Sequence, residues 1–393
     1  MSTATFVCLT NIPTPYRLFL FRRMHQRLNE LGWRFEVWFM AGSESGRQWA
    51  FKNSDFQFPH RFLGAKSLRI GSTALHWNPE ISHVLRDACP DVLLVAGAWI
   101  HPTVLLAALS STPARTIFWS ESHLESIRQR GFLAGIARRW MLSRFSEFAV
   151  PGRLAKRYVE HHAAAARIYY LPNVVDPAVF RMYRREGDNG LIGSQDQNRR
   201  VLLIVARLAA EKGLIPFLHG VEKLGPEDRY KLTVLIAGSG SLKKLIQRWI
   251  VRHNFDVRLL GQQTQSQIAQ LYAQADGFCL PSIYDPNPIS VIEASWAGLP
   301  LLLSSRVGNH PECLESGRNG FLFESGDPES VATAVSRWLG LTRLELTAFG
   351  ENSVQIARSS FDPDTVVSNF LDEILAESAR PAESRLESAA SAR

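Results

Sequence analysis

Short apolar runs alternate with amphipathic stretches along most of the chain. The first half contains β-rich apolar runs at Thr5–Leu9, Phe35–Phe39, Val92–Val95, Thr116–Trp119 and Phe148–Val150. The second half repeats the pattern at Val201–Val205, Leu232–Ala237, Val257–Leu260, Gly277–Leu280 and Leu301–Leu303. Segments with helical periodicity separate these runs, among them Tyr16–Leu31, Leu242–His253 and Gln265–Ala275. Continuous apolar strands between helices are typical of parallel sheets covered on both faces, so the pattern predicts an α/β protein.

The alternation breaks once, in a polar, glycine-containing segment at residues 176–199. A break of this kind indicates a linker, and a length of 393 residues also favours two domains. We therefore expect one α/β domain at residues 1–175 and a second at residues 200–361. Residues 379–393 are rich in Ala, Ser, Glu and Arg and are expected to be disordered. In parallel sheets, ligands bind beyond the carboxyl ends of the strands, so the loops after the apolar runs are where chemistry is expected.

Positive charge is concentrated in the first half of the chain. Residues 1–172 contain 21 Lys and Arg against 11 Asp and Glu, whereas the remaining residues contain 23 against 26. Such a basic half suits an anionic membrane, a phosphorylated ligand or nucleic acid, or it is simply a solvated face. The sequence lacks the aromatic-basic interleaving of an RNA-binding sheet and any helix-turn-helix pattern, so nucleic acid is not the partner we expect.

The cysteines and the lengths of the apolar segments indicate in which cellular compartment the protein is expected. Cys8, Cys89, Cys279 and Cys313 show no metal-like spacing and no disulfide framework, which predicts reduced thiols, most of them buried. No signal-peptide pattern opens the chain, and no run of about 18 apolar residues occurs. We expect a cytoplasmic protein, with peripheral contact at the inner face of an anionic membrane as a further hypothesis.

Two cations follow the first strand of the second half. Arg207 and Lys212 lie five residues apart, just beyond Val201–Val205. The planar fork of arginine and the mobile charge of lysine suit a diphosphate together, although two surface cations at a helix start are the alternative. The loop Ala237–Leu242 also lies between a strand and a helix. Its residues Gly238 and Gly240 permit close backbone approach, but many tight turns look like this.

Two carboxylates stand in the stretch Leu280–Ala294. Asp285 lies on the loop after a strand, and Glu293 lies inside an apolar segment that reads as the start of a buried helix. A carboxylate among apolar neighbours needs a partner, which could be a ligand hydroxyl or a structural salt bridge.

The order of these motifs resembles a known family. The sequences V-A-R-L-A-A-E-K-G, A-G-S-G-S-L, L-P-S-I-Y-D-P-N-P-I-S-V-I-E-A-S-W-A-G-L-P and G-N-H-P-E look like those of the retaining glycosyltransferases of family 4. The segment L-P-N-V-V-D-P-A-V-F at Leu171–Phe180 is also similar to that family. The resemblance runs from about Leu171 to Phe323, and the first half shares with the family only the alternation of strands and helices. It implies the GT-B fold, with two Rossmann-like domains that face each other across a cleft, and a C-terminal helix at about 362–378 that packs back on the first domain.

The resemblance also implies roles in a donor site. Arg207 and Lys212 fall where the family binds the donor diphosphate, and Glu293 falls where it holds the ribose hydroxyls. Asp285 stands where a glutamate near the transferred sugar is usual. The other positions expected to bind the donor are Gly238, Gly240, Gly261, Ser282, Asn287, Pro288 and Ile289. The reaction implied is transfer of a hexose from a UDP- or GDP-sugar to an acceptor hydroxyl with retention, in assembly of a bacterial surface polysaccharide or glycolipid.

The acceptor side departs from the family. The usual Gly-Gly phosphate loop is absent, and the loop from Asn11 to Arg17 takes its place, so both residues are candidates for acceptor or phosphate binding. Glu121 and His123 follow the run Thr116–Trp119, and either could act on the acceptor. The alternative is that this loop only caps a helix through its serines. A lipid-linked or oligosaccharide acceptor would suit the basic half.

The motif Asp362-Pro363-Asp364 looks like a metal site, but it precedes an amphipathic run and is better explained as a helix start. His161-His162 lacks partners and is interpreted as a pair on a helix surface. We therefore expect neither a required metal nor another cofactor. The alternatives to a transferase are a nucleotide-sugar epimerase or glycoside phosphorylase of the same fold, a basic nucleic-acid-binding protein, and an inactive scaffold.

Overall fold

The computed structural model describes residues 3–44, 49, 51–64, 66–70, 73–110, 114–126, 131–182 and 199–378. The chain divides into two compact units, and each is considered by itself. The first unit comprises Met1–Val174 together with Pro363–Arg393, and the second comprises Val175–Asp362. Of the linker expected at 176–199, residues 177–182 form a helix of the second unit, and residues 183–198 lie outside the described residues. The tail expected to be disordered, 379–393, also lies outside them.

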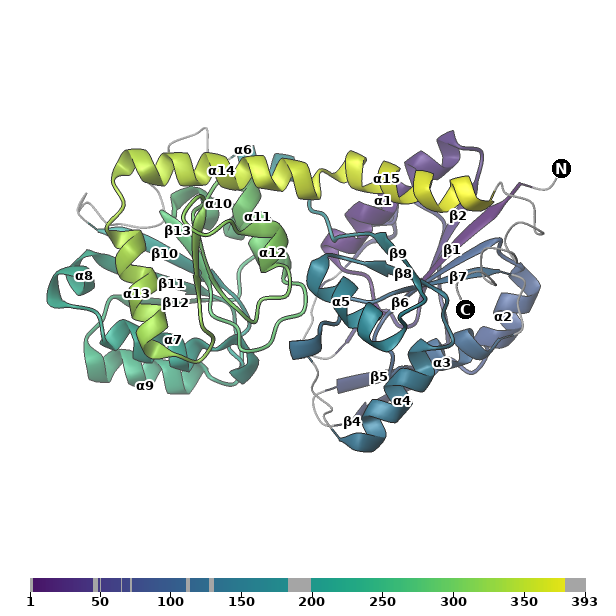
Figure 1. The fold of residues 1–393 in the computed structure, drawn as a ribbon, viewed down its shortest axis with the longest axis horizontal. Helices are drawn as coiled ribbons and strands as arrows, with labels where there is room; N and C mark the ends of the chain where they lie inside the picture. Colours follow the sequence, from purple (N-terminus) through teal and green to yellow (C-terminus); the bar gives the residue numbers. More distant parts are fainter. Residues whose placement is uncertain are drawn as a thin grey trace. The chain divides into compact units, whose positions relative to one another are not determined.

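The first unit is built on a seven-stranded sheet with the order β3-β2-β1-β6-β7-β8-β9, in which all neighbouring strands are parallel (Figure 1). Its strands are β1 (Thr5–Thr10), β2 (Arg34–Phe39), β3 (His60–Phe62), β6 (Val92–Ala96), β7 (Arg115–Trp119), β8 (Glu147–Val150) and β9 (Arg167–Tyr170). A separate antiparallel pair is formed by β4 (Lys66–Ile70) and β5 (Thr73–Trp77). The helices of this unit are α1 (Pro15–Glu30), α2 (Ile81–Ala88), α3 (Pro102–Leu109), α4 (Phe132–Leu142), α5 (Arg153–His162) and α15 (Pro363–Ser378), with short 3₁₀ turns η1 (Asn53–Asp55) and η2 (Leu124–Ser126).

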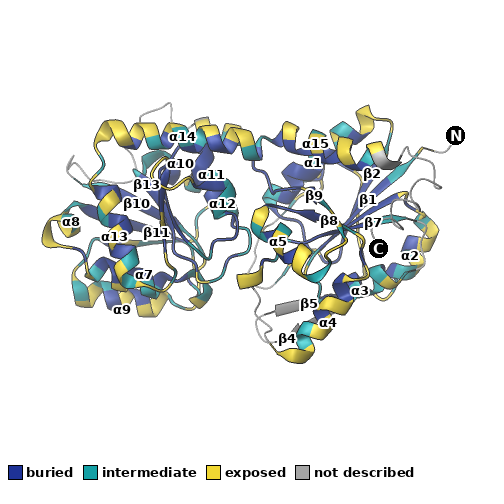
Figure 2. Ribbon diagram, viewed as in Figure 1, coloured by how far each residue is buried: buried dark blue, intermediate teal, exposed yellow. Residues whose placement is uncertain are grey.

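Both faces of this sheet are covered by helices. Successive side chains of a strand point to opposite faces, so each strand contributes to two cores. In β1, Phe6 and Cys8 belong to a core that also contains residues of α1 and α15. Val7 and Leu9 belong to a second core with residues of α2, α3 and α5. Figure 2 shows the strands as buried and the outer helix surfaces as exposed. The C-terminal α15 packs on α1 and β9, and its Asp372 pairs with Arg27 of α1 at 3.1 Å.

The second unit contains a six-stranded sheet with the order β12-β11-β10-β13-β14-β15, again with parallel neighbours. Its strands are β10 (Arg200–Val205), β11 (Leu232–Ala237), β12 (Val257–Gly261), β13 (Gly277–Leu280), β14 (Leu301–Ser304) and β15 (Gly320–Phe323). Its helical elements are α6 (Pro177–Met182), η4 (Ala210–Lys212), α7 (Leu214–Glu222), α8 (Pro226–Lys231), α9 (Lys243–His253), α10 (Gln265–Gln274), α11 (Ile289–Trp296), α12 (His310–Cys313), α13 (Pro328–Leu339) and α14 (Arg343–Phe361). Figure 1 shows α10 and α11 on one side of this sheet and α7 and α9 on the other.

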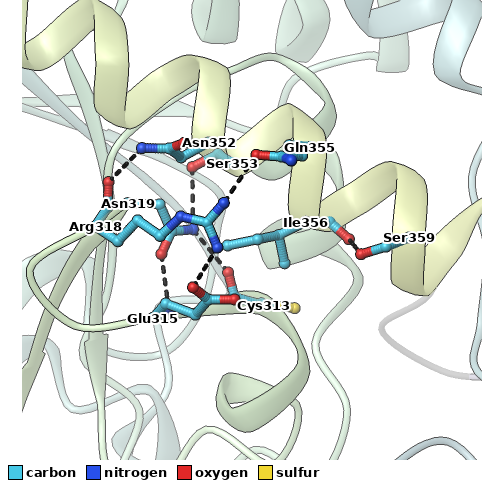
Figure 3. A network of polar contacts seen from close by, with 9 residues as sticks. All are labelled: Cys313, Glu315, Arg318, Asn319, Asn352, Ser353, Gln355, Ile356 and Ser359. Atoms are coloured by element: carbon cyan, nitrogen blue, oxygen red, sulfur yellow. Dashed lines mark hydrogen bonds and ion pairs between the residues drawn. The ribbon is translucent and has the colours of Figure 1, made fainter.

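A buried asparagine fixes α14 to the turn before β15 (Figure 3). The Asn319 amide donates to the carbonyl oxygen of Cys313 at 2.8 Å and to the Ser353 hydroxyl at 3.2 Å. Its carbonyl oxygen accepts from the backbone amide of Glu315 at 2.8 Å, and Ser353 in turn donates to the carbonyl oxygen of Leu299 at 2.7 Å. The side chain therefore replaces backbone hydrogen bonds that the turn cannot make by itself.

The sequence pattern predicted these sheets but missed some of their strands. All ten expected strands overlap observed ones, and the α/β class is confirmed. The missed strands of the two sheets are β3, β9 and β15, and each is an edge strand. All four cysteines are free thiols; Cys89 is exposed and the other three are buried.

Candidate functional site

The structure joins Lys212 to Asp285, which are 73 residues apart in the chain. Lys212 ends η4, beyond the carboxyl end of β10, and Asp285 lies on the loop after β13. The Lys212 ammonium donates to Oδ2 of Asp285, and the Ser282 hydroxyl approaches the same oxygen at 3.4 Å. Both partners of the ion pair are largely buried. A buried charge pair at the ends of adjacent strands is a feature typical of a ligand site in a parallel sheet.

Close backbone packing sets the position of this pair. Gly213 follows Lys212 with φ at +65°, and a Cβ atom there would lie 1.9 Å from the carbonyl oxygen of Pro281. The carbonyl oxygen of Glu211 accepts from the backbone amides of Ile283 and Tyr284 at 2.9 and 3.0 Å. Only glycine allows this approach, so the turn after β10 is held directly against the loop after β13.

Arg207 takes a different position from Lys212. Its side chain is 60% exposed, and its guanidinium pairs with Glu211 at 2.8 Å. An exposed ion pair of this kind contributes little to stability, so the guanidinium can exchange this partner for another anion at small cost. The structure therefore presents one fixed cation and one mobile cation after β10.

The expected glycines of the donor site hold two loops together. A Cβ atom on Gly238 would lie 1.9 Å from the carbonyl oxygen of Ala206, and one on Gly240 would lie 2.4 Å from that of Leu208. The backbone of Leu208 also bonds to Ser239 at 2.9 Å. These glycines thus set the course of the loop that carries Arg207. Gly261, with φ at +72°, has open space where a Cβ atom would lie, and its carbonyl oxygen accepts from the Gly238 amide at 2.7 Å.

The first turn of α11 is fixed from the loop after β14. Pro288 is the N-cap residue and Ile289 the first residue of the helix, directly after Asn287. The Asn309 amide donates to the carbonyl oxygen of Pro288 at 2.9 Å, and the Gly308 amide donates to that of Asp285 at 2.8 Å. The helix start therefore follows the Asp285 loop closely, and its free backbone amides provide a partial positive charge in this part of the site.

Glu293 lies one turn further along α11 and contacts Tyr272 of α10. The Tyr272 hydroxyl donates to Oε2 of Glu293 at 3.0 Å and lies 3.1 Å from the carbonyl oxygen of Ser290. Burial raises the pKa of Glu293 to about 7, although the hydrogen bond from Tyr272 works in the opposite direction. No cation pairs with this carboxyl among the residues that the structure describes, so the salt bridge considered from the sequence is not the explanation for it.

In the first unit, Arg17 and Glu121 form a second polar cluster. Arg17 lies in the first turn of α1, and its guanidinium pairs with Oε1 of Glu121 at 3.1 Å. The Asn173 amide donates to the same oxygen at 2.6 Å. The Arg17 guanidinium also lies 3.6 Å from the centroid of the Trp119 ring, at the end of β7. Its Nη1 atom is buried without a hydrogen bond, as is Oδ1 of Asn173. An orphan donor and an orphan acceptor on two residues that bond to the same Glu121 oxygen suit a ligand that carries hydroxyl groups.

The two remaining candidates of the first unit lie at the ends of its strands. His123 is buried and follows Glu121 on the loop after β7. Asn11 follows β1, and its Oδ1 atom lies against Gly97, where a Cβ atom would approach it to 2.5 Å.

The sequence did not single out Tyr272, Asn309 or Asn173, which hold Glu293, α11 and Glu121 respectively. Asn309 stood within the G-N-H-P-E motif and Asn173 within L-P-N-V-V-D, so a motif signal existed for those two. Tyr272 gave none, because an aromatic residue at helical spacing reads as core. Across the described residues, no group of three or more His, Cys, Asp and Glu side chains is arranged to hold a metal ion. In the same part of the chain, no helix is both long and apolar enough to cross a membrane.

Two parallel α/β units of this kind define the GT-B fold, and solved structures agree. The structure of Anabaena Alr3699/HepE in complex with UDP superimposes with a TM-score of 0.74 at 17% identity, over 95% of this chain and 100% of that chain. The sucrose-phosphate synthase of Thermosynechococcus elongatus gives a TM-score of 0.72 at 14% identity, over 95% of this chain and 98% of that one. At these identities, the likeness shows the fold.

A family model matches most of the second unit. Residues 192–354 match the family described as glycosyl transferases, group 1. An uncharacterized glycosyltransferase of Methanocaldococcus jannaschii, MJ1607, is 33% identical over 152 residues, which are 38% of this chain and 37% of that protein. The chain thus matches less than half the length of this relative. The family match and this relative show that the second unit is similar in sequence to glycosyltransferases of group 1.

Proposed function

We propose that this protein is a retaining glycosyltransferase of family 4, which transfers a sugar from a nucleoside-diphosphate sugar to an acceptor hydroxyl. The observation that carries the proposal is the ion pair of Lys212 and Asp285 at the ends of β10 and β13. The proposal is supported by contact between a largely buried cation and a carboxylate, by the exposed Arg207 five residues before Lys212, and by the start of α11 four residues after Asp285. A diphosphate needs the cations, and a sugar hydroxyl needs the carboxylate.

In the proposed reaction, the bond between the anomeric carbon and the diphosphate oxygen breaks, and a bond from that carbon to the acceptor oxygen forms on the same face. Arg207 and Lys212 stabilise the negative charge that develops on the leaving diphosphate, which is the main catalytic contribution. The acceptor hydroxyl passes its proton to the departing diphosphate oxygen as it attacks, which gives the nucleoside diphosphate and the glycosylated acceptor. Asp285 binds the transferred sugar, and Glu293 accepts hydrogen bonds from the ribose hydroxyls. Gly238, Gly240, Gly261, Ser282, Asn287, Pro288 and Ile289 line the donor.

The acceptor is assigned to the first unit. Arg17 and Asn11 bind it, and either Glu121 or His123 contacts the reacting hydroxyl. The orphan atoms on Arg17 and Asn173 support a hydroxyl-bearing acceptor. A galactosyltransferase of Escherichia coli, 29% identical over 176 residues (44% of this chain and 45% of that protein), is named for UDP-Gal and for an acceptor on diphosphoundecaprenol. A lipid-linked acceptor in bacterial surface polysaccharide assembly is accordingly the substrate class we propose.

Nucleotide binding tests the donor site. The full chain is titrated calorimetrically with UDP, GDP, ADP and TDP, and its melting temperature is followed in parallel. Ligand at about 100 times its dissociation constant adds about 2.7 kcal/mol to the free energy of unfolding. One nucleotide should bind, and both Arg207→Ala and Lys212→Met should weaken it more than about tenfold. Lys244→Ala, which removes an exposed lysine of α9, is the matched control. No binding of any nucleotide, or equal loss in the control, would contradict the proposal.

An epimerase of the same fold is the second candidate, because it would use the same nucleotide-sugar site. The two are separated by the products. A transferase incubated with donor and acceptor yields free nucleoside diphosphate and a glycosylated acceptor, whereas an epimerase yields an isomeric sugar without an acceptor.

A further inference from the structure

Helix α4 of the first unit presents an apolar face to solvent. Phe132 is 83% exposed and Leu133 is 79% exposed, and Ile136 and Trp140 are also exposed. Phe132, Ile136 and Trp140 are spaced four residues apart and therefore share one side of the helix. In Figure 2, α4 carries exposed residues along much of its length. A helix on the surface of a protein in water normally shows the opposite arrangement, with its apolar side turned inward.

The inward side of α4 is firmly anchored. Met141 and Leu142 belong to the core between the sheet and helices α2, α3 and α5. Arg138 is buried, and its guanidinium lies 5.3 Å from the centroid of the Trp99 ring. The helix thus holds a cation inside while its aromatic and aliphatic residues face outward. A cluster of large apolar side chains exposed in this way marks an interaction surface.

The segment that contains α4 carries only positive charges. Residues 126–146 contain five arginines and no Asp or Glu. Arg139 and Arg144 are exposed, and in the described part of the chain neither has a carboxylate within ion-pair distance. The Arg144 guanidinium lies 4.7 Å from the centroid of the Trp140 ring. Tryptophan and arginine side by side at the edge of an apolar face are typical of helices that lie at the boundary between lipid tails and headgroups.

The size of the face decides between possible partners. An 11-residue helix is about 16 Å long, and one side of it offers a few hundred Å² at most, on the order of half the area of about 800 Å² that each partner buries in a stable protein complex. A lipid surface requires no matching shape, since apolar side chains enter the acyl region and arginines bind the phosphates. We infer that α4 docks this protein on an anionic lipid bilayer, with Phe132, Leu133, Ile136 and Trp140 inserted. This inference is independent of the donor site.

Vesicle co-sedimentation of the full chain tests it. The vesicles contain phosphatidylcholine alone or with about 30 mol% phosphatidylglycerol. The protein should bind the anionic vesicles in a salt-sensitive manner and the neutral ones more weakly. The double variant Phe132→Glu with Leu133→Glu should lose more than about tenfold in apparent affinity, because charge replaces two inserted side chains. Arg139→Gln should lose about fivefold at low salt.

The matched control places the same change on equally exposed apolar side chains of the second unit. Val251 is 84% exposed and Leu344 is 80% exposed, and their double variant to glutamate should bind vesicles like the unchanged chain. All variants should keep the melting temperature and the response to nucleotide, which separates this test from that of the donor site. Failure of the unchanged chain to bind anionic vesicles would overturn the inference, as would equal loss in the control. A change from dimer to monomer on substitution of Phe132 and Leu133, with vesicle binding intact, would assign the face to a second copy instead.

Discussion

Glu293 is expected to make the stability of this protein fall as the pH rises from 5 to 8. Its pKa is raised from 4.5 to about 7, mainly by burial. In the unfolded chain the carboxyl ionises near pH 4.5, but in the folded chain it stays protonated to about pH 7. Between these values the folded state holds one more proton than the unfolded state. Its contribution is therefore fully present below pH 4.5 and is lost as the pH rises through 7.

The size of the effect follows from the shift. One pKa unit corresponds to about 1.4 kcal/mol, so the full change is up to about 3 kcal/mol. The Glu293 side chain keeps some contact with solvent, which lowers the expected value to between about 1 and 3 kcal/mol. The change Glu293→Gln removes the titration and keeps the shape of the protonated acid. The free energy of unfolding of the Glu293→Gln variant, relative to that of the unchanged chain, should rise by this amount between pH 5 and pH 8.5.

Urea unfolding at several pH values measures the difference between the two chains. Other groups titrate in both and cancel, including His101 and His162, whose pKa values burial lowers to about 4. Tyr272→Phe is the second variant. It removes the hydrogen bond that favours the ionised carboxyl, so it should raise the pKa of Glu293 further and enlarge the loss at high pH. Parallel pH profiles for Glu293→Gln and the unchanged chain would refute the reasoning.

Three further results are expected. Gly213→Ala should lower the free energy of unfolding by about 3 kcal/mol or more and weaken nucleotide binding, because the new Cβ atom would push the Lys212 turn away from Pro281. Calorimetry measures both effects, and the control Gly261→Ala, where a Cβ atom meets open space, should lower the free energy of unfolding by only about 1–2 kcal/mol. Asn319→Ala should cost about 2–4 kcal/mol in urea unfolding, since it strands buried backbone groups at the turn before β15, whereas a change of less than 1 kcal/mol would mean that water replaces the amide. Arg17→Lys keeps the charge but loses the contact with Trp119, so kcat/KM for the acceptor should fall more than about tenfold while donor affinity stays unchanged. An equal loss of donor affinity would contradict the assignment of Arg17 to acceptor binding.

The order of elements and most of the candidate motifs could be predicted from the sequence for a local reason. A strand buried on both faces must be apolar throughout, and each such run stands out between amphipathic helices, as at Val201–Val205 and Leu232–Ala237. The edge strands β3 and β9 were missed because exposed polar residues such as Arg61 and Arg167 interrupt their apolar pattern, which an edge strand tolerates. The third missed edge strand, β15, is apolar but only four residues long. The motifs around Lys212 and Glu293 were visible because they combine fixed residue types at short spacing.

Pairing between distant positions was decided by the tertiary structure alone. Nothing local relates Lys212 to Asp285; the parallel pairing of β10 with β13 and the close approach at Gly213 bring them together. The same holds for Arg17 and Glu121, which meet because β1 and β7 end at the same edge of one sheet. The orientation of α4 was also decided by the tertiary structure, because its sequence would favour an inward apolar face. In the fold, Met141 and Leu142 pack into the core, whereas Phe132 and Leu133 stay exposed.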